Sequence, residues 1–259
     1  MNFTFKLGLK LHSINTDLIP ELFNLFENSI FQYIELYIIP NSYNTVLTYW
    51  KNLKIPYIIH APHSFHGVNL AQRVKMADNS KYIKESQLFA DNLDSDLIIV
   101  HGGNNGTIEQ TIFQIKSFND ARIIVENKPK KGIMNEKCIG WSPSEFKYMK
   151  EEGILSGIAL DFLHAACAAC SEKMSVMKII NDLLTFNPKV YHLSDGNILS
   201  EKDNHCNLGK GNLSLHKFVS KISEGSMITL ETPRRYDRGL EDFIDDVYYF
   251  RNMMRDLIK

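Results

Sequence analysis

Eight short strand-like runs, alternating with helical or loop stretches, constrain the fold of this sequence more than any other feature. Strand–helix alternation is typical of a parallel sheet, and eight such units in one chain favour closure into a barrel over an open sheet. A (β/α)8 barrel needs about 250 residues, and the chain has 259. We therefore predict an α/β fold, a single TIM barrel domain over residues 1–259. The runs are Phe3–Leu11, Tyr33–Ile39, Tyr57–His60, Leu97–His101, Arg122–Glu126, Gly157–Asp161, Val190–Leu193 and Met227–Glu231.

The stretches between the runs are patterned like helices. In the last of them, Phe243, Val247, Phe250 and Met254 follow one another at intervals of three and four residues, which places them on one helical face. No linker, low-complexity tract or change of composition divides the sequence into two domains. Helical stretches are predicted at Thr16–Phe26, Tyr43–Leu53, Asp78–Leu93, Ile108–Phe118 and Leu240–Leu257.

Composition limits the class of protein only weakly. The formal net charge is -1, from 29 basic and 30 acidic residues, whereas a dedicated nucleic-acid coat protein is usually basic. Four cysteines are too few for a disulfide scaffold, and the pair Cys167 and Cys170 is interpreted as two small residues of an Ala-rich helix. The sequence starts without a signal-peptide pattern, and no apolar run reaches about 18 residues. We therefore expect a soluble, cytoplasmic monomer with no membrane partner.

Each of six successive strand-like runs, from the third to the eighth, has a histidine or an acidic residue at or just after its end. The carboxyl ends of the strands in a parallel barrel meet at one rim, where the active sites of such barrels lie. A single histidine at a strand end is usually an ordinary hydrogen-bonded loop residue. A convergent set of buried carboxylates, however, needs a compensating cation, because desolvating unpaired charges is costly. The residues concerned are His60 with His63, His101, Glu126, Asp161 with His164, His192, and Glu231.

The stretch that begins at Val190 brings further groups to the same rim. His192 lies on the seventh run and Asp195 follows it, and Asp203 and His205 precede a Gly-x-Gly turn. This turn lacks the third glycine of a dinucleotide-binding fingerprint. Imidazole and carboxylate without thiolate suit Zn, Mn or Fe, and the number of groups exceeds what one ion uses. The sequence therefore predicts a site for more than one metal ion.

The order of these groups resembles the endonuclease IV (apurinic/apyrimidinic endonuclease family 2) branch of the xylose isomerase-like barrel superfamily. The resemblance extends over nearly the whole chain and implies a barrel that holds three zinc ions, with Mn as an alternative metal. The motifs that carry it are His63-Ser-Phe-His-Gly-Val-Asn-Leu70, His101-Gly-Gly, Glu126, Asp161-x-x-His164, His192, Asp203-x-His205 and Glu231.

The resemblance implies nine ligands in three sets and a reaction. Glu126, Asp161 and Glu231 are the implied catalytic carboxylates, and Glu126 bridges two of the ions. Metals bridged in this way activate a water and stabilise charge on a phosphate oxygen. The implied reaction is hydrolysis of a phosphodiester in DNA at abasic sites. The three sets are His63, His101 and Glu126; Glu126, Asp161, His192 and Glu231; and His164, Asp203 and His205.

Cationic residues that follow the strand ends suit an anionic substrate. We predict that Lys128, Lys210 and Arg234 bind the substrate. His66 is predicted to join them, because it stands where the family has a tyrosine. The loop Pro40–Thr45 departs from the family by lacking a basic residue. Further cations that follow the same strands are Lys130, Lys131 and Arg235.

Two other functions stay open from the sequence. A sugar isomerase or epimerase on the same barrel would use one divalent metal, with carboxylates that also transfer protons; its ligands would be Glu126, Asp161, His192 and Glu231. Such an enzyme has no need for the remaining five histidine and aspartate residues together, so their joint presence favours three metals. A non-catalytic metal-binding protein is the third possibility, and it leaves the cations at the rim without a purpose.

Overall fold

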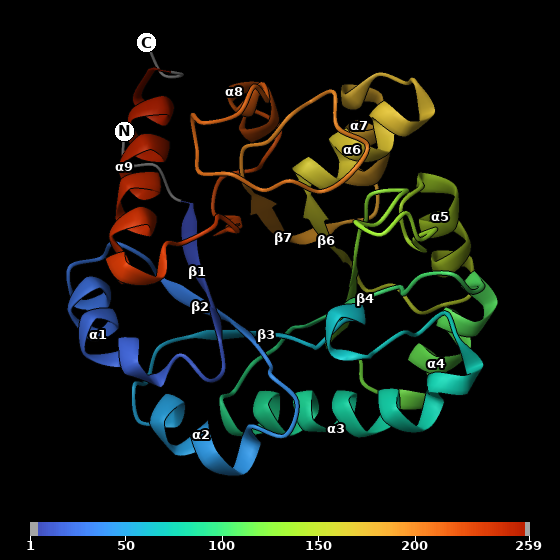
Figure 1. Ribbon diagram of the computed structural model, residues 1–259, viewed down its shortest axis with the longest axis horizontal. Coiled ribbons are helices and arrows are strands. Elements are labelled where there is room, and N and C mark those ends of the chain that lie inside the picture. Colours follow the sequence, from blue (N-terminus) through green and yellow to red (C-terminus); the bar gives the residue numbers. More distant parts are fainter. Residues whose placement is uncertain (1–4, 257–259) are drawn as a thin grey trace.

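The computed structural model describes residues 5–256, and their eight strands close into a parallel barrel (Figure 1). Each strand pairs with the next along the chain, and β8 pairs with β1 to close the ring. The predicted TIM barrel is thus confirmed. The strands are β1 (Lys6–His12), β2 (Tyr33–Tyr37), β3 (Tyr57–His60), β4 (Ile98–His101), β5 (Ile123–Glu126), β6 (Ile158–Asp161), β7 (Pro188–Leu193) and β8 (Met227–Leu230).

The helices form an outer ring around the barrel (Figure 1). No helix within residues 5–256 is long and apolar enough to span a membrane. Short 3-10 turns occur at Thr16–Leu18, Ser64–His66, Arg73–Lys75 and Tyr236–Arg238. The α-helices are α1 (Ile19–Glu27), α2 (Tyr43–Lys51), α3 (Met76–Asn92), α4 (Ile108–Phe118), α5 (Pro143–Glu151), α6 (Phe162–Glu172), α7 (Val176–Leu184), α8 (Leu215–Val219) and α9 (Glu241–Asp256).

The boundaries differ from the sequence prediction mainly near the ends of the elements. The first predicted strand begins at residues outside the described range, and β1 extends one residue beyond it to His12. The helix predicted from Thr16 starts instead as a 3-10 turn, and α1 begins at Ile19 with a proline in its first turn, where a missing N–H costs nothing. The Ala-rich segment forms α6, in which Cys167 and Cys170 are free thiols.

Two apolar layers hold the barrel together. One lies between the sheet and the helices and contains large buried side chains such as Trp50, Phe89 and Phe162. The other fills the inside of the barrel. Because successive residues of a strand point to opposite faces, each strand gives alternate residues to each layer. The inner layer consists of Tyr33, Ile58, Ile99, Ile124, Ala159 and Val190.

Gly8→Ala should destabilise the barrel. A Cβ atom at Gly8 would lie 2.2 Å from Cζ and 2.6 Å from the hydroxyl oxygen of Tyr33, whose buried hydroxyl is bonded to Thr229 at 2.8 Å. Overpacking of this kind costs about 1–3 kcal/mol, which urea unfolding would measure. Lys6→Ala, on an exposed position of the same strand, is the control and should change the free energy of unfolding by less than about 0.5 kcal/mol. Equal effects of the two substitutions would contradict this account.

Candidate metal centre

A layer of polar side chains lies on the inner face of the barrel, two residues beyond the inner apolar layer. Ile58, Ile99 and Ile124 belong to the apolar layer, and the period of two brings the residue two positions later on each strand to the same face. These later residues are His60, His101 and Glu126, the last residues of β3, β4 and β5. The same rule applies to Asp161 on β6 and His192 on β7. Strand geometry alone therefore explains why these groups converge.

The first candidate metal group surrounds Glu126, whose side chain is 1% exposed. Its Oε2 atom lies 3.1 Å from Nε2 of His60 and 3.1 Å from Nε2 of His101. One potential ligand atom from each of the three residues falls within 4.8 Å of the others. The group has the mixed imidazole and carboxylate chemistry that zinc and manganese accept.

His63 was expected in this group, and the structure places His60 in it and His63 beside it. The strand β3 ends at His60, so the inward period of two reaches this residue. His63 comes three residues later, as the cap of the 3-10 turn Ser64–His66, where its Nδ1 accepts a hydrogen bond from the backbone N–H of Phe65 at 3.3 Å. Its ring stacks on that of His101, with centroids 4.5 Å apart. His63 therefore lies against the first group and outside the three candidate metal groups.

The second group contains the four residues expected for it. Glu126, Asp161, His192 and Glu231 come from or follow β5, β6, β7 and β8, and they offer ligand atoms within 4.8 Å of one another. Nδ1 of His192 is 2.8 Å from Oε2 of Glu231 and 3.5 Å from Oε2 of Glu126. Glu126 belongs to both groups, which matches its expected position between two ions.

The third group joins α6 to the loop after β7. Asp161 caps α6 and accepts a hydrogen bond from the backbone N–H of His164 at 2.6 Å, which fixes the histidine on the first helical turn. Asp161, His164 and His205 form the group. Asp203 stands beside it, 3.3 Å from Nε2 of His164 and 3.3 Å from Nδ1 of His205. The expected trio thus meets, with Asp161 as an additional member.

Asp195 does not line the centre and instead shapes the loop that returns Asp203 and His205. Its carboxylate accepts hydrogen bonds from the backbone N–H groups of Gly196 at 2.8 Å, Gly209 at 3.0 Å and Leu213 at 3.1 Å. A carboxylate satisfied by backbone donors holds the two ends of the loop together. Asp195 therefore has a structural position, in contrast to the ligand or acid–base role considered for it from the sequence.

Buried ligand atoms without a hydrogen bond mark where cations fit. Within the described chain, buried polar atoms that lack a hydrogen-bond partner include one from each of five residues of the second and third groups. Four of them face one another in pairs, His192 with Glu231 at 2.8 Å and His205 with Asp161 at 3.6 Å, and a divalent metal between such atoms would bind both. The donor set of oxygen and imidazole nitrogen therefore fits zinc or manganese. The atoms are Glu126 Oε1, Asp161 Oδ2, His192 Nδ1, His205 Nε2 and Glu231 Oε2.

Burial and neighbouring charges divide the histidines into two kinds. Burial, reinforced by the ammonium group of Lys128, lowers the pKa of His101 to about 3, so its ring is neutral. Burial also disfavours the charged form of His164, but the carboxylates of Asp161 and Asp203 outweigh it and raise the pKa to about 10. The pKa of His205 is raised in the same way by Asp161 and Asp203 against the effect of burial. Only the first kind is ready to bind a metal without losing a proton.

Four of the six cations expected at the rim pair with carboxylates of the protein, one of them Lys128 with Glu126 at 3.6 Å. Lys130 pairs with Glu172, Lys131 with Glu201, and Arg235 with Asp242 at 2.8 Å. These pairs balance part of the positive charge that the sequence places at the rim. Glu172 and Glu201 come from distant parts of the sequence, whereas Asp242 follows Arg235 by 7 positions.

The four residues predicted to bind substrate lie in different surroundings. Lys128 reaches into the centre, with Nζ 3.6 Å from Oε1 of Glu126 and 3.4 Å from Nε2 of His164. Nδ1 of His66 is held by the hydroxyl of Tyr37 at 2.8 Å. Arg234 is shared by two cavities, one of which also contains Glu231 and His205. Lys210 lines only the outer one of these two cavities.

Two cavities open over the candidate ligands. One, of about 490 Å³, is lined by His60, His63, His66 and His101 and by the exposed Phe65. The other, of about 280 Å³, is lined by His12, His205, Glu231 and Arg234, and Lys10 lines both. A substrate that enters either cavity therefore meets the candidate metal groups directly.

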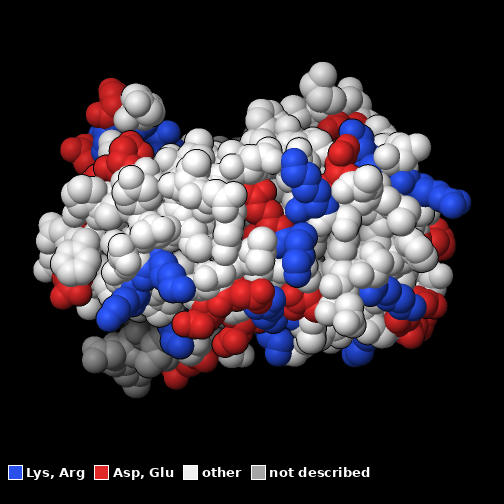
Figure 2. Space-filling view, turned by 90° about the horizontal axis from the view of Figure 1, so that it is seen from below, with Lys and Arg blue, Asp and Glu red and all other residues white. Residues whose placement is uncertain are grey.

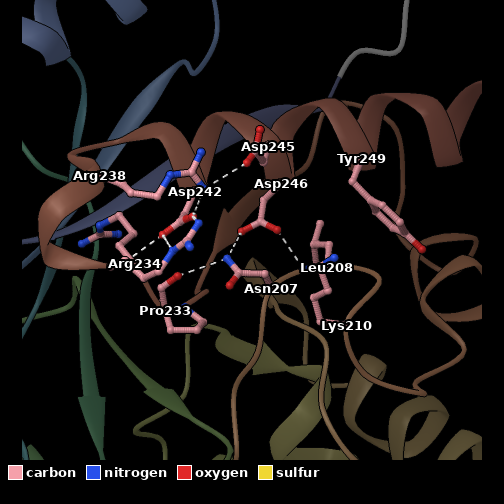
Figure 3. Close-up of a pocket in the computed structure, with 11 residues that line it drawn as sticks. Asn207, Leu208, Lys210, Pro233, Arg234, Arg238, Asp242, Asp245, Asp246 and Tyr249 are labelled. Atoms are coloured by element: carbon pink, nitrogen blue, oxygen red, sulfur yellow. Dashed lines mark hydrogen bonds and ion pairs between the residues drawn. The ribbon is translucent and has the colours of Figure 1, made fainter.

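A third cavity, of about 680 Å³, lies beside the centre between α9 and the loops after β7 and β8 (Figure 3). In it, Asp246 accepts hydrogen bonds from the side chain of Asn207 and the backbone N–H of Leu208, both at 2.8 Å. Asp242 binds Arg238 at 2.7 Å. These bonds fasten both loops to α9, so this cavity supports the site from outside.

The sequence did not single out Lys10 or Glu35, which also point into the barrel. Nζ of Lys10 lies 3.1 Å from Oε1 of Glu35 and 2.8 Å from Oε1 of Glu231. The alternation of strand residues could have found them. Lys10 comes two residues after Gly8 on β1 and Glu35 two residues after Tyr33 on β2, so each faces the inside of the barrel like the candidate ligands on the other strands.

Solved structures similar to this one carry different names. A D-tagatose 3-epimerase-like protein matches with a TM-score of 0.76 and 18% identity over 98% of both chains. Endonuclease IV from Thermus thermophilus matches with a TM-score of 0.73 and 18% identity over 97% of this chain and 99% of that one. A putative xylose isomerase from Rhodospirillum rubrum matches with 0.73 and 12% identity over 96% and 99%. No protein-family model and no curated protein matches the sequence.

The fold and the site together define a class. At these identities the likeness establishes the fold alone, which is a (β/α)8 barrel. Three groups of candidate metal ligands lie at the carboxyl ends of its strands. The endonuclease and the epimerase-like protein share this fold, so the fold does not choose between their activities.

His60→Ala should remove a metal ligand and His63→Ala should not. His60 faces Glu126, whereas His63 lies outside the candidate groups. Loss of one of three protein ligands should lower the bound zinc by roughly one ion per chain. Metal analysis of the purified variants after dialysis measures this, with the exposed His216 of α8 replaced by Ala as a control. The opposite result would restore His63 as the ligand.

Zinc binding to the metal-free protein should release protons at neutral pH. His164 holds a proton there because its pKa is raised to about 10, and a metal binds only the unprotonated nitrogen. Zinc affinity should therefore rise between about pH 6 and about pH 8. Calorimetry in two buffers of different ionisation enthalpy reports the proton release as a difference in heat. Equal heats in the two buffers would refute the assignment.

Proposed function

We propose that this protein is a divalent-metal-dependent phosphodiester hydrolase with a trinuclear centre. The observation that carries the proposal is the pair of histidine groups on either side of the four-residue group. His60 and His101 join Glu126 on one side, and His164 and His205 join Asp161 on the other. A mononuclear enzyme has no use for either pair. Glu126 and Asp161 each connect two groups, as ligands shared between neighbouring ions would.

The residues have separate tasks in this proposal. Zinc is the proposed metal and manganese the alternative, and such ions polarise a phosphoryl oxygen and lower the pKa of a bound water. Glu126, Asp161 and Glu231 would hold the ions, and their negative charge would balance that of the metals. Lys128, next to Glu126, and Arg234, at the mouth, orient an anionic substrate. The buried inner apolar layer closes the floor of the site to water.

We further propose DNA with an abasic site as the substrate. This proposal is supported by the resemblance to endonuclease IV and by an aromatic side chain at the mouth. Phe65 lies beside His66 at the rim and is 85% exposed, and exposed rings can stack on bases. On the side of the molecule in Figure 2, basic and acidic residues lie intermixed. Contacts with DNA are therefore proposed at the mouth of the barrel.

A sugar isomerase or epimerase is the second candidate function. The observation in its favour is that Glu126, Asp161, His192 and Glu231 form a complete ligand group by themselves. A similar structure carries the name of a D-tagatose 3-epimerase-like protein. In this case one metal would bind, and a carboxylate would move a proton of the sugar.

Incision of a duplex with a single abasic site tests the preferred function. The zinc-loaded wild type should cut at that site and contain close to three zinc ions per chain. His101→Ala and His205→Ala each remove a ligand from one of the flanking groups. Each should lower the rate by more than about 100-fold, because even partners outside the ligand shell affect activity by 10–100-fold. His216→Ala, on exposed α8, should keep the wild-type rate.

The two candidate functions separate in the same experiment. One tightly bound ion per chain, no incision, and conversion of a ketose into its epimer would support the isomerase or epimerase. Three ions without incision would retain the trinuclear centre but reject abasic DNA as its substrate. Fully active His101→Ala and His205→Ala variants would reject the centre itself.

A further inference from the structure

Glu35 is a buried carboxylate that none of the three candidate metal groups contains. It lies on β2 inside the barrel, is 0% exposed, and points to the same face as Tyr33 below it. A carboxylate in such a place is costly unless its oxygens are paired and hydrogen-bonded. The groups that contact the Glu35 carboxylate therefore indicate its role.

Both oxygens of Glu35 have partners inside the barrel. Oε2 accepts a hydrogen bond from the hydroxyl of Thr229 at 2.7 Å and lies 2.8 Å from Nε2 of His192. Oε1 faces the ammonium of Lys10 at 3.1 Å. The hydroxyl of Tyr33 in turn bonds that of Thr229 at 2.8 Å. Glu35 is thus held from three sides, and one of its contacts is a candidate metal ligand.

The contact with His192 determines which ring nitrogen is free. Nε2 holds its proton toward the carboxylate of Glu35, so a metal ion that replaced the proton on the other side of the ring would bind the lone pair of Nδ1. Nδ1 is the atom that faces the second group, 2.8 Å from Oε2 of Glu231. The orientation therefore presents Nδ1 to the place where a metal fits.

We propose that Glu35 is a positioning residue that holds His192 in the tautomer and orientation needed to bind a metal ion. The proposal rests on the metal binding that the proposed function includes. Carboxylates that accept the second N–H of a metal-bound histidine fix the ring and strengthen the bond to the metal. Glu35 acts from β2, a strand that supplies no member of the three groups. Through this contact, β2 supports the centre although it contributes no candidate ligand.

Lys10 provides a contrast to Glu35, because the two form one ion pair with different consequences for the metal. Removing the charge of Glu35 weakens its hold on His192. Removing Lys10 leaves the contact between Glu35 and His192 in place and takes away a cation close to Glu231. A positioning role for Glu35 thus predicts effects of opposite sign, whereas a merely structural role for the pair predicts the same loss in both.

The test compares Glu35→Gln with Lys10→Met in the full-length protein, using zinc and a chromophoric chelator as competitor. Glu35→Gln should weaken the binding of one zinc ion by about 10–100-fold. Lys10→Met should leave that affinity equal or higher. Tyr33→Phe, which removes only the hydroxyl next to Thr229, is the matched control and should bind zinc like the wild type.

The outcomes that would contradict the metal centre differ from those that would contradict only the role of Glu35. A wild type that binds no zinc would overturn the metal centre and with it the proposed function. A wild type that binds zinc while Glu35→Gln keeps the same affinity would overturn only the role of Glu35, as would equal losses in both variants.

If the Glu35→Gln variant does not fold, 15N NMR of the histidine side chains in the zinc-loaded wild type tests the proposal instead. His192 should keep its proton on Nε2, with its resonance assigned from a His192→Asn variant. A proton on Nδ1 would contradict the proposal.

Discussion

The carboxylate of Glu126 is the constraint on which the rest of the centre depends. It is almost completely buried, and imidazoles from β3, β4, β7 and α6 lie within 3.5 Å of its oxygens. A charge in such a place is stable only if its surroundings supply compensating charge and hydrogen bonds. The neighbouring histidines and the ammonium group of Lys128 supply this compensation. The loop that carries His205 adds a further imidazole to the same centre.

The barrel meets this requirement by separating its interior into layers. The inner apolar side chains fill the lower part, and the polar side chains occupy the next positions on the same strands. Rigid strands position the ligands more accurately than loops would. The loops contribute only what strands cannot reach, and Asp195 and Asp246 fasten them by accepting hydrogen bonds from their backbone. The accuracy of the site thus comes from the sheet, and its third group comes from a restrained loop.

Proteins with different names share this barrel, so the distinction between functions lies in the rim. Four converging residues suffice for one metal, whereas the flanking histidines of this chain extend the group in two directions. Glu126 and Asp161 each belong to two of the groups, so each of these carboxylates is placed where it could contact two ions. Function on this fold therefore depends on how many strand ends carry a ligand and on whether the loops add more.

Much of this architecture was predictable from the sequence, because it depends on short-range periodicity. The eight runs, their alternation with helices and the polar residue at the end of most strands are local patterns, and parallel strands bring such ends to one rim. From this, the convergence of Glu126, Asp161, His192 and Glu231 on one rim was predictable, whereas their assignment to one ligand set came from the resemblance to a family. What the sequence motif could not decide was whether His60 or His63 turns inward, since that depends on the residue at which β3 ends.

Only the tertiary structure decided the pairings across the barrel. Glu35 meets His192 although 157 residues separate them, and Lys10 meets Glu231 across the closing seam between β1 and β8. Lys130 and Lys131 likewise pair with carboxylates 42 and 70 positions away, Glu172 and Glu201. A sequence determines which way each strand residue can face, because the backbone alternates by two. Which residues then meet is decided by closure of the sheet, because closure sets the register between strands that are far apart in the chain.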